Sequence, residues 1–231
     1  MLRLENVSKV YGRGGQTVVA LQPTTLHLAA GEYVAVVGPS GSGKSTLLTV
    51  LGGMLAPTTG QVFFGGQSLY DLALAKRAAL RGKQMGFVFQ TFNLISYLSA
   101  LENVQMPLFL AGLSPRVQRE RALAVLDRVG LADRIHHKPS ELSVGQQQRV
   151  ALARTLANDP ALILADEPTG NLDPRTREQV LDLFDQFHAE GRTIITVTHD
   201  PQAARRANRI LCLEAGTVTE FRDPARVMHV A

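Results

Sequence analysis

The chain has 231 residues, of which 45% are hydrophobic and 19% charged, and its 24 Lys and Arg against 20 Asp and Glu give a formal net charge of +4. This composition is typical of a globular protein and excludes intrinsic disorder, a collagen repeat and a disulfide scaffold. The length predicts one large domain, or a core with a smaller subdomain. Because Cys212 is the only cysteine, an internal disulfide and a cysteine-based zinc site are also excluded.

Neither a membrane span nor nucleic-acid binding is predicted. The longest uncharged run, from Ser45 to Tyr70, contains five glycines and Pro57, which interrupt a helix repeatedly. The first residues, MLRLENVSKVYG, have no apolar core of signal-peptide length. The excess of positive charge is small and scattered, so we do not expect nucleic acid as a partner, although a surface near anionic lipid would suit it equally. We expect a cytoplasmic protein.

The first ninety residues alternate strand-like runs with turns. We expect strands over 2–10 and 17–28, and a fully apolar strand over 33–38 (YVAVVG) of the kind that is covered on both faces of a sheet. An apolar helix (STLLTVLGGML) follows a glycine-rich loop and ends before Pro57 and Gly60. A further strand pair is expected around QVFFGG and MGFVFQ.

The glycine-rich loop, GPSGSGKS over 38–45, fits the pattern G-x-x-x-x-G-K-[ST] between a strand and a helix. Its glycines let backbone N–H groups surround a phosphate, and the helix N-terminus adds partial positive charge. The alternative is a glycine turn before an ordinary helix, a pattern that chance gives in roughly 1% of chains of this length. We predict a nucleotide site made by Gly38, Ser40, Gly41, Ser42, Gly43, Lys44, Ser45 and Thr46.

From about Thr91 to Asn158 the pattern becomes helical. Ser114 and Pro115 predict a helix start, and Gly130 predicts its end. Between them an apolar stripe recurs at helical spacing, formed by Ala122, Val125, Leu126 and Val129. Pro160 ends the later helix QQQRVALARTLAND.

An α/β pattern returns after Pro160. We expect buried strands ALILAD and TIITVTH, an amphipathic helix TREQVLDLFDQFHAE between them, and a final hairpin over 209–221 that turns at Ala215-Gly216. The first of these strands ends in Asp166 and Glu167, where a parallel sheet places its ligands. Asp166 is suited to hold Mg²⁺ and Glu167 to polarise an attacking water, although alone the pair is more often a strand end that meets solvent.

The segment LSVGQQQRV (142–150) resembles the signature of ABC-type ATPases, and other family motifs stand in the same order: Tyr11, the phosphate loop, Gln90, the signature, ALILADE, Asn171 to Asp173, and His199. This resemblance covers nearly the whole chain. It implies a single α/β domain over 1–231, a P-loop NTPase with ABC-type topology. Residues 1–90 and 159–231 would form a RecA-like core with an N-terminal β subdomain, and 91–158 an inserted α-helical subdomain. It also implies ATP and Mg²⁺ as cofactors.

The resemblance assigns roles to individual residues. Tyr11 would stack on adenine, and Gln90 would touch Mg²⁺ or the water. Asp173 would cross a dimer interface, and His199 would contact the γ-phosphate and orient Glu167. The Mg²⁺ ligands would be Ser45, Gln90 and Asp166, and the catalytic residues Glu167, His199, Gln90 and Lys44.

The signature has a physical interpretation of its own. Ser143 and Gln146 form a capping-box pattern that opens a helix, and in isolation it indicates no more than a helix start. In the family this end faces the γ-phosphate bound by the opposite subunit, so Ser143, Gly145 and Gln146 would bind the partner's nucleotide. Val144 stands where the family usually has Gly, and we expect function to survive. Two chains would therefore enclose two ATP molecules as a homodimer.

Two segments, FVFQTFNLISYLSALENVQMPLFLAG and LADEPTGNLD, resemble the ATPases of lipoprotein-release and macrolide-export systems. This implies an integral membrane permease as partner, with four helices and a large extracytoplasmic domain, and a peripheral place on the cytoplasmic face of the inner membrane. A related cell-division ATPase that regulates wall hydrolases and a soluble ABC-type ATPase are the alternatives. Five apolar residues after Gln90 would form a docking groove or simply pack the helical subdomain: Phe92, Leu94, Ile95, Tyr97 and Leu98.

Overall fold

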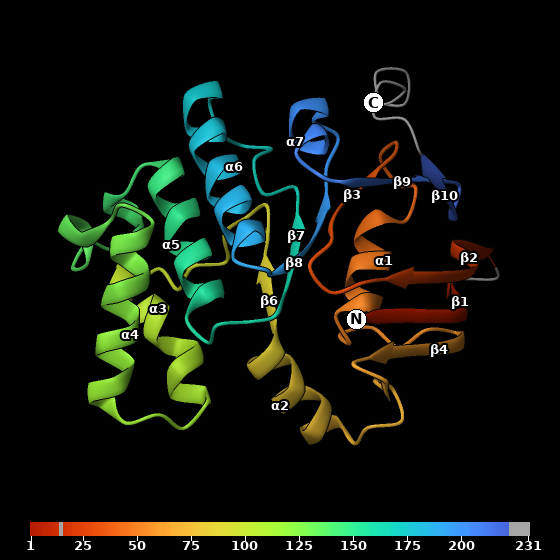
Figure 1. Cartoon of the computed structure of the whole chain (residues 1–231), viewed down its shortest axis with the longest axis horizontal. Helices are drawn as coiled ribbons and strands as arrows, with labels where there is room; N and C mark the ends of the chain where they lie inside the picture. The colour runs from red at the N-terminus through yellow and green to blue at the C-terminus, as the bar shows by residue number, and fades with distance from the viewer. Residues whose placement is uncertain (14–15, 222–231) are drawn as a thin grey trace.

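The computed structural model describes residues 1–13 and 16–221, and shows two β-sheets with helices between and beside them (Figure 1). Residues 14–15 and 222–231, which the predicted domain range 1–231 includes, lie outside the described residues. Within the described ranges, no helix is both long enough and apolar enough to cross a membrane.

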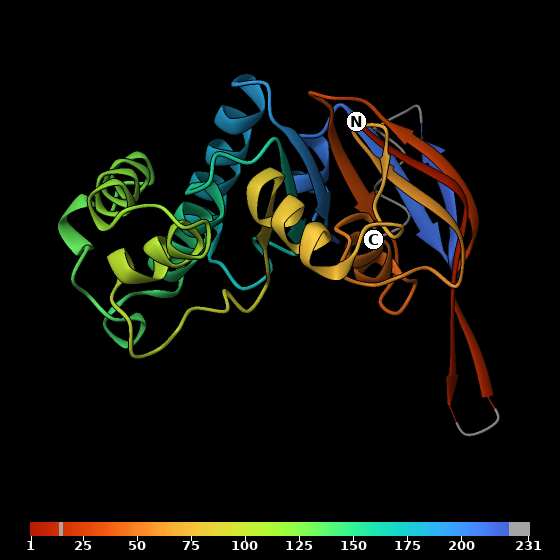
Figure 2. The same cartoon turned by 90° about the horizontal axis from the view of Figure 1, so that it is seen from below.

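The first sheet is antiparallel, with the strand order β2-β1-β4-β5. Its strands are β1 (Leu2–Arg13), β2 (Gln16–Leu28), β4 (Thr59–Phe64) and β5 (Gln67–Ser68). Strands β1 and β2 pair from Leu2↔Leu28 out to the hairpin end, which extends from the body of the molecule as a two-stranded ribbon (Figure 2). The two strands predicted for this region are confirmed, and both are longer than predicted.

The second sheet has the strand order β10-β9-β3-β8-β7-β6 and is parallel except at its β9–β10 hairpin. Its strands are β3 (Tyr33–Val37), β6 (Met85–Val88), β7 (Leu162–Asp166), β8 (Thr193–Val197), β9 (Arg209–Glu214) and β10 (Thr217–Phe221). The hairpin turns at Ala215-Gly216 as predicted, with φ of 46° and 80°. Positive φ at both central residues is the geometry of the tight turn that matches strand twist.

The expected strand pair around QVFFGG and MGFVFQ is wrong in one respect. Both segments are strands, but β4 pairs with β1 and β5 in the antiparallel sheet, whereas β6 pairs with β7 in the parallel sheet. An apolar run predicts a strand without identifying its partner, because pairing depends on how the intervening chain crosses between sheets.

Seven α-helices are assigned within the described ranges: α1 (Lys44–Leu51), α2 (Leu74–Gln84), α3 (Ala100–Leu110), α4 (Pro115–Arg128), α5 (Val144–Leu156), α6 (Pro174–Ala189) and α7 (Pro201–Arg205). Short 3₁₀ turns occupy Ala132–Arg134 and Pro139–Glu141. The sequence interpretation missed α2. This helix is amphipathic, but its half-buried face at Arg77, Leu80, Arg81 and Gln84 holds a single apolar residue.

The parallel sheet has an apolar core on each face. Along β3, Tyr33, Ala35 and Val37 belong to the core that includes helices α3 to α6, and Val34 and Val36 belong to the core shared with α1 and the antiparallel sheet. Successive side chains of a strand point to opposite faces, so a strand buried on both faces must be apolar throughout. The structure therefore confirms the prediction made from YVAVVG.

Helices α3, α4 and α5 pack together on the side of the parallel sheet opposite the antiparallel strands (Figure 1). Ala122, Leu126 and Val129 of the predicted stripe are buried, Val125 is partly buried, and Gly130 follows the helix with φ of 69°. The predicted helical character does not begin at Thr91, since α3 starts only at Ala100. The division into a core of 1–90 and 159–231 and a subdomain of 91–158 stays a prediction.

Candidate functional site

Four strands of the parallel sheet end beside predicted site residues. The phosphate loop follows β3, Gln90 follows β6, Glu167 follows β7, and His199 follows β8. Because β3, β8, β7 and β6 are parallel neighbours, their carboxyl ends lie along one edge, which is where open α/β sheets bind ligands. The tertiary structure thus brings together groups that are up to about 160 residues apart in the chain.

Neighbouring strands hold the phosphate loop in place. A Cβ added at Gly38 would overlap the carbonyl oxygen of Leu213, and one at Gly43 would overlap that of Ala20. Both glycines also have positive φ, 151° and 106°. Strand β2 and the β9–β10 hairpin therefore lie directly against the loop. Sequence reasoning explained these glycines by approach to a phosphate, but packing against backbone already requires them.

Within this loop, three features suit a phosphate. The Ser42 Oγ is buried and has no hydrogen-bond partner among the described residues. The Lys44 Nζ donates to the carbonyl oxygens of Gly38 at 2.8 Å and Pro39 at 2.9 Å, so the ammonium lies over the loop. Helix α1 begins at Gly43 without a side-chain cap, which leaves its first-turn N–H groups available to an anion. These features of the loop fit the phosphates of a nucleoside triphosphate.

The Glu167 carboxylate contacts His199. His199 Nδ1 lies 2.8 Å from Glu167 Oε1, and the His199 backbone N–H donates to Oε2 at 3.4 Å. Glu167 has φ of 47°, a left-handed conformation that costs a non-glycine residue about 1–3 kcal/mol and persists where the surroundings impose it. Its backbone N–H donates to Val197 O of the neighbouring strand. The predicted His199–Glu167 pairing is therefore present in the geometry.

The Mg²⁺ ligands predicted from the sequence are oxygen donors of three kinds. They are the Ser45 hydroxyl at the start of α1, the Asp166 carboxylate that ends β7, and the Gln90 amide after β6. Gln90 lies against the loop that follows Glu167, where Asn171 Nδ2 donates to its backbone oxygen at 3.3 Å. No three His, Cys, Asp or Glu side chains cluster as a metal site in residues 1–13 and 16–221. A site with one carboxylate and phosphate oxygens is the type that suits Mg²⁺.

Tyr11 stands on the β1–β2 ribbon of the antiparallel sheet. It pairs with Val18 across the ribbon, and its side chain is 42% exposed. The Lys9 ammonium lies 5.3 Å from its ring centre. An accessible ring of this kind suits the stacking predicted for it.

Helix α5 begins at the signature with the predicted capping box. The Ser143 hydroxyl accepts from the backbone N–H of Gln146 at 3.3 Å, and Gln146 Oε1 accepts from the Ser143 N–H at 2.9 Å. Val144 is 47% exposed, so its side chain has room. A Cβ added at Gly145 would overlap the Thr176 methyl group, which shows how closely α5 rests on the first turn of α6.

Asp173, predicted to cross a dimer interface, caps helix α6 of its own chain. Its Oδ1 accepts from the backbone N–H groups of Arg175 and Thr176, both at 3.1 Å. The Thr176 hydroxyl and N–H bonds hold the pKa of Asp173 below its ordinary value. The interface role stays a prediction.

Sequence reasoning missed two polar residues of α5. Arg154 donates to the carbonyl oxygens of Phe92 at 2.6 Å and Asn93 at 2.5 Å, and burial lowers the pKa of its guanidinium. Gln148 is fully buried and donates from Nε2 to Pro168 O at 2.5 Å. Each stands on the face of α5 that packs into the protein, and a polar residue at such a position was the signal available in the sequence.

The five apolar residues after Gln90 do not behave as one group. Leu94 packs against the core shared with the helices, which agrees with the packing alternative. Tyr97 is 73% exposed. Phe92, Ile95 and Leu98 are partly buried.

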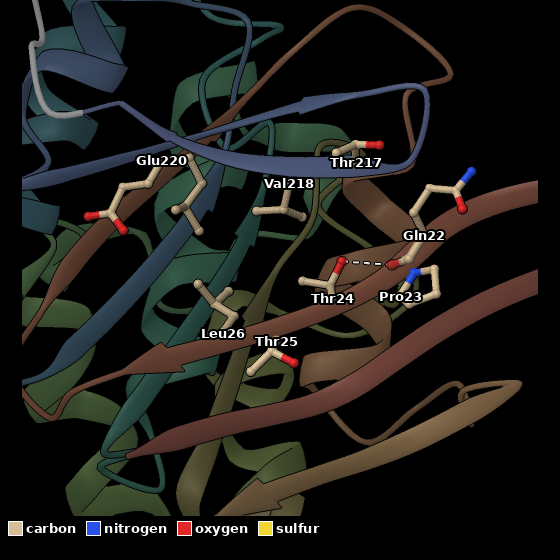
Figure 3. Close-up of a pocket in the computed structure, with 9 residues that line it drawn as sticks. Gln22, Pro23, Thr24, Thr25, Leu26, Thr217, Val218 and Glu220 are labelled. Carbon is tan, nitrogen blue, oxygen red and sulfur yellow. Dashed lines mark hydrogen bonds between the residues drawn. The ribbon is translucent and has the colours of Figure 1, made fainter.

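A separate hollow of about 210 Å³ lies between β2 and β10 (Figure 3). It is lined by Gln22, Pro23, Thr24, Thr25, Leu26, Leu211, Thr217, Val218 and Glu220. None of the predicted nucleotide residues lines it, so it is not the predicted nucleotide site.

The chain is similar to known ABC transporter proteins in sequence. The ABC transporter family model matches residues 21–170. A Thermotoga maritima protein named as an uncharacterized ABC transporter ATP-binding protein is 45% identical, over 94% of this chain and 93% of its own length. The macrolide export ATP-binding/permease protein MacB of Hyphomonas neptunium is 47% identical over 94% of this chain, but the match spans only 34% of MacB.

The fold of the chain is also similar to solved structures of an ATP-binding cassette. The dimeric ATP-binding cassette MJ0796 bound to ADP and Pi superposes with a TM-score of 0.89 at 42% identity, over 96% of this chain and 100% of the other. A second dimeric structure of MJ0796, described as a bacterial ABC transporter cassette, gives 0.89 at 43%.

Proposed function

The chain belongs to the ABC transporter family of ATP-hydrolysing cassettes, and we propose that it powers a membrane complex of the lipoprotein-release or macrolide-export type. Membership confirms the predicted α/β P-loop fold, ATP binding and ATP hydrolysis. The observation that carries the finer proposal is the likeness to MacB, whose name joins an ATP-binding part to a permease. The chain spans about a third of such relatives, so we propose that the permease lies outside these 231 residues.

We propose that the phosphates bind at the loop before α1. Its first-turn N–H groups, the Ser42 hydroxyl and the Lys44 ammonium would surround the β- and γ-phosphates. Ser45, Asp166 and Gln90 would hold Mg²⁺, which neutralises phosphate charge when bound. Tyr11 would stack on the adenine ring.

Glu167 and His199 would together carry out the hydrolysis step. Glu167 would accept the proton of the attacking water, since its carboxylate stands beside the sheet edge that receives the phosphates. The 2.8 Å contact with His199 Nδ1 orients the carboxylate, and an imidazole that carries a proton on its other nitrogen as well would donate to the γ-phosphate. The strained backbone of Glu167 is consistent with a carboxylate that the surrounding structure holds in one orientation.

A second copy of the chain would complete the site. The phosphate loop and the signature would serve different nucleotides, so a two-fold dimer would place Ser143, Gly145 and Gln146 of one copy on the γ-phosphate of the other, with Asp173 between them. The MJ0796 cassette is described as dimeric, which supports this arrangement. Exposed Tyr97, close to Gln90 in sequence, is the candidate contact to a four-helix permease at the cytoplasmic face of the inner membrane.

The test is a pull-down from detergent-solubilised membranes with tagged Glu167→Gln protein and Mg-ATP. We expect this variant to bind ATP, lose turnover and recover an integral membrane protein with four spans and a large external domain. The matched control is the double variant Lys44→Ala/Glu167→Gln, which should recover far less. Recovery of soluble proteins or nucleic acid alone would overturn the transport proposal, and wild-type turnover by Glu167→Gln would overturn the catalytic assignment.

A further inference from the structure

We propose that Gln148 is a positioning residue for ATP hydrolysis, which holds the loop carrying Glu167 to the helix that begins at the signature. The inference rests on the proposed catalytic role of Glu167. Gln148 is fully buried and acts through Pro168, whose carbonyl oxygen it binds.

The contact is short and local to the carboxylate. Gln148 Nε2 donates to Pro168 O at 2.5 Å across 20 residues of sequence, and Gln148 is fully buried. Pro168 directly follows Glu167, whose left-handed φ of 47° persists only under restraint. Hydrogen bonds from three other parts of the chain contribute to that restraint. The Glu167 N–H is bound to Val197 O, its carboxylate to His199, and the next carbonyl to Gln148. Gln148 is the one of these anchors that comes from α5.

Burying a glutamine costs free energy that an apolar side chain of the same size would not cost. Its Oε1 has no hydrogen-bond partner among the described residues, so half of the amide is buried without compensation. Leu152, one turn further along α5, fills the same core with apolar atoms only. What the amide adds at position 148 is a donor aimed at the Glu167 loop.

Helix α5 also rests on the segment after that loop. Gly145 contacts Thr176 in the first turn of α6 so closely that no Cβ fits. Gln148 lies about 7.5 Å along the helix from Ser143, at a rise of about 1.5 Å per residue. A phosphate that binds at Ser143 and shifts the start of α5 would therefore act on Pro168 through the Gln148 hydrogen bond. This gives one chain a short connection between its signature and its own Glu167.

The experiment compares two buried glutamines in the full-length protein. Gln148→Met keeps the volume and removes the donor. We expect kcat for ATP hydrolysis to fall about 10- to 100-fold, because small displacements of a catalytic group have effects of that size. The KM for ATP should stay within about twofold, since the phosphate loop is untouched.

The control is Gln118→Met in α4. Gln118 is also buried and its Nε2 also donates to a backbone oxygen, that of Leu113 at 2.6 Å. It should lower Tm by a similar amount and leave kcat within about twofold. Should both variants lower kcat in proportion to their loss of Tm, the role of Gln148 is structural and the inference is overturned. Unchanged kcat in Gln148→Met overturns it as well.

A second variant covers failure to fold. Gln148→Asn keeps the amide but is one methylene too short to reach Pro168, and we expect the same loss of kcat at unchanged KM. Full activity in this variant contradicts the inference. The parent proposal fails separately, because it is wrong if Glu167→Gln turns over ATP like wild type, whatever Gln148 does.

Discussion

Helices α1 and α5 both begin at a proposed phosphate site, but their N-termini are built in opposite ways. At α1 the cap is Gly43, which offers no side chain and lies directly against the backbone of Ala20 in β2. At α5 the cap is Ser143, which already satisfies the N–H of Gln146 through a reciprocal capping box. One N-terminus has free donors in a rigid cradle, whereas the other is a self-capped helix end.

The difference suggests a division of work. An N-terminus with uncapped N–H groups is stabilised when an anion arrives, so α1 is suited to bind the nucleotide without help. The capped end of α5 is stable by itself and offers an anion only the Ser143 hydroxyl hydrogen, the nearby backbone and the helix dipole. We therefore expect substitutions at α1 to remove binding and those at α5 to reduce turnover with binding preserved.

The largest effect is expected from Lys44→Ala. Loss of the ammonium over the phosphate loop removes charge stabilisation from the transferring phosphoryl group, which costs about 10²–10³ in rate. Steady-state hydrolysis with ATP titration measures both turnover and affinity. Turnover and affinity equal to wild type would show that the α1 site does not bind the phosphates.

Gly145→Ala should come next. The added methyl overlaps Thr176, so we expect a loss of stability of about 1–3 kcal/mol and a fall in turnover of roughly tenfold. The double variant Gly145→Ala/Thr176→Ala opens the space and should recover most of both losses. Thermal melts measure the stability of both variants, and steady-state assays measure their hydrolysis rates. If turnover stays low while stability returns, the glycine is needed for phosphate approach rather than for packing.

Ser143→Ala separates capping from catalysis. Removal of the cap should destabilise the protein by about 1 kcal/mol, with ATP affinity unchanged. Ser143→Asp restores a cap but adds negative charge where a phosphate is proposed to bind. We expect Ser143→Asp to recover the thermal midpoint and to lower turnover below that of Ser143→Ala. An aspartate variant as active as wild type would argue against any phosphate at this end of α5.

The smallest effect is expected from Val144→Gly, the change toward the usual family residue. Val144 is half-exposed at the first position of α5, so glycine should lower stability by about 0.5 kcal/mol or less. Hydrolysis should stay within about twofold of wild type. A gain of tenfold or more would mean that the valine restricts the signature, which would sharpen the contrast with α1, whose cap is a glycine.

Patterns local in sequence predicted most elements correctly. The continuous run YVAVVG predicted a doubly covered strand, Ser143 and Gln146 a capping box, and Ala215-Gly216 a hairpin turn, because each rests on interactions within a few residues. Helix α2 was missed, because the face that packs against the protein is mostly Arg and Gln rather than apolar. The predicted pairing of β4 with β6 was wrong, because two strands of similar composition can join different sheets.

The sequence by itself determined the chemistry available to this protein: a phosphate loop, an oxygen-donor set, a carboxylate and a histidine, each in a recognisable local context. Only the tertiary structure decided which of them meet. Glu167 contacts His199, Gly38 and Gly43 are closed in by Leu213 and Ala20, and Gln148 reaches Pro168. These contacts join residues whose spacing carries no periodic signal, because strand order and helix packing set them rather than local backbone geometry.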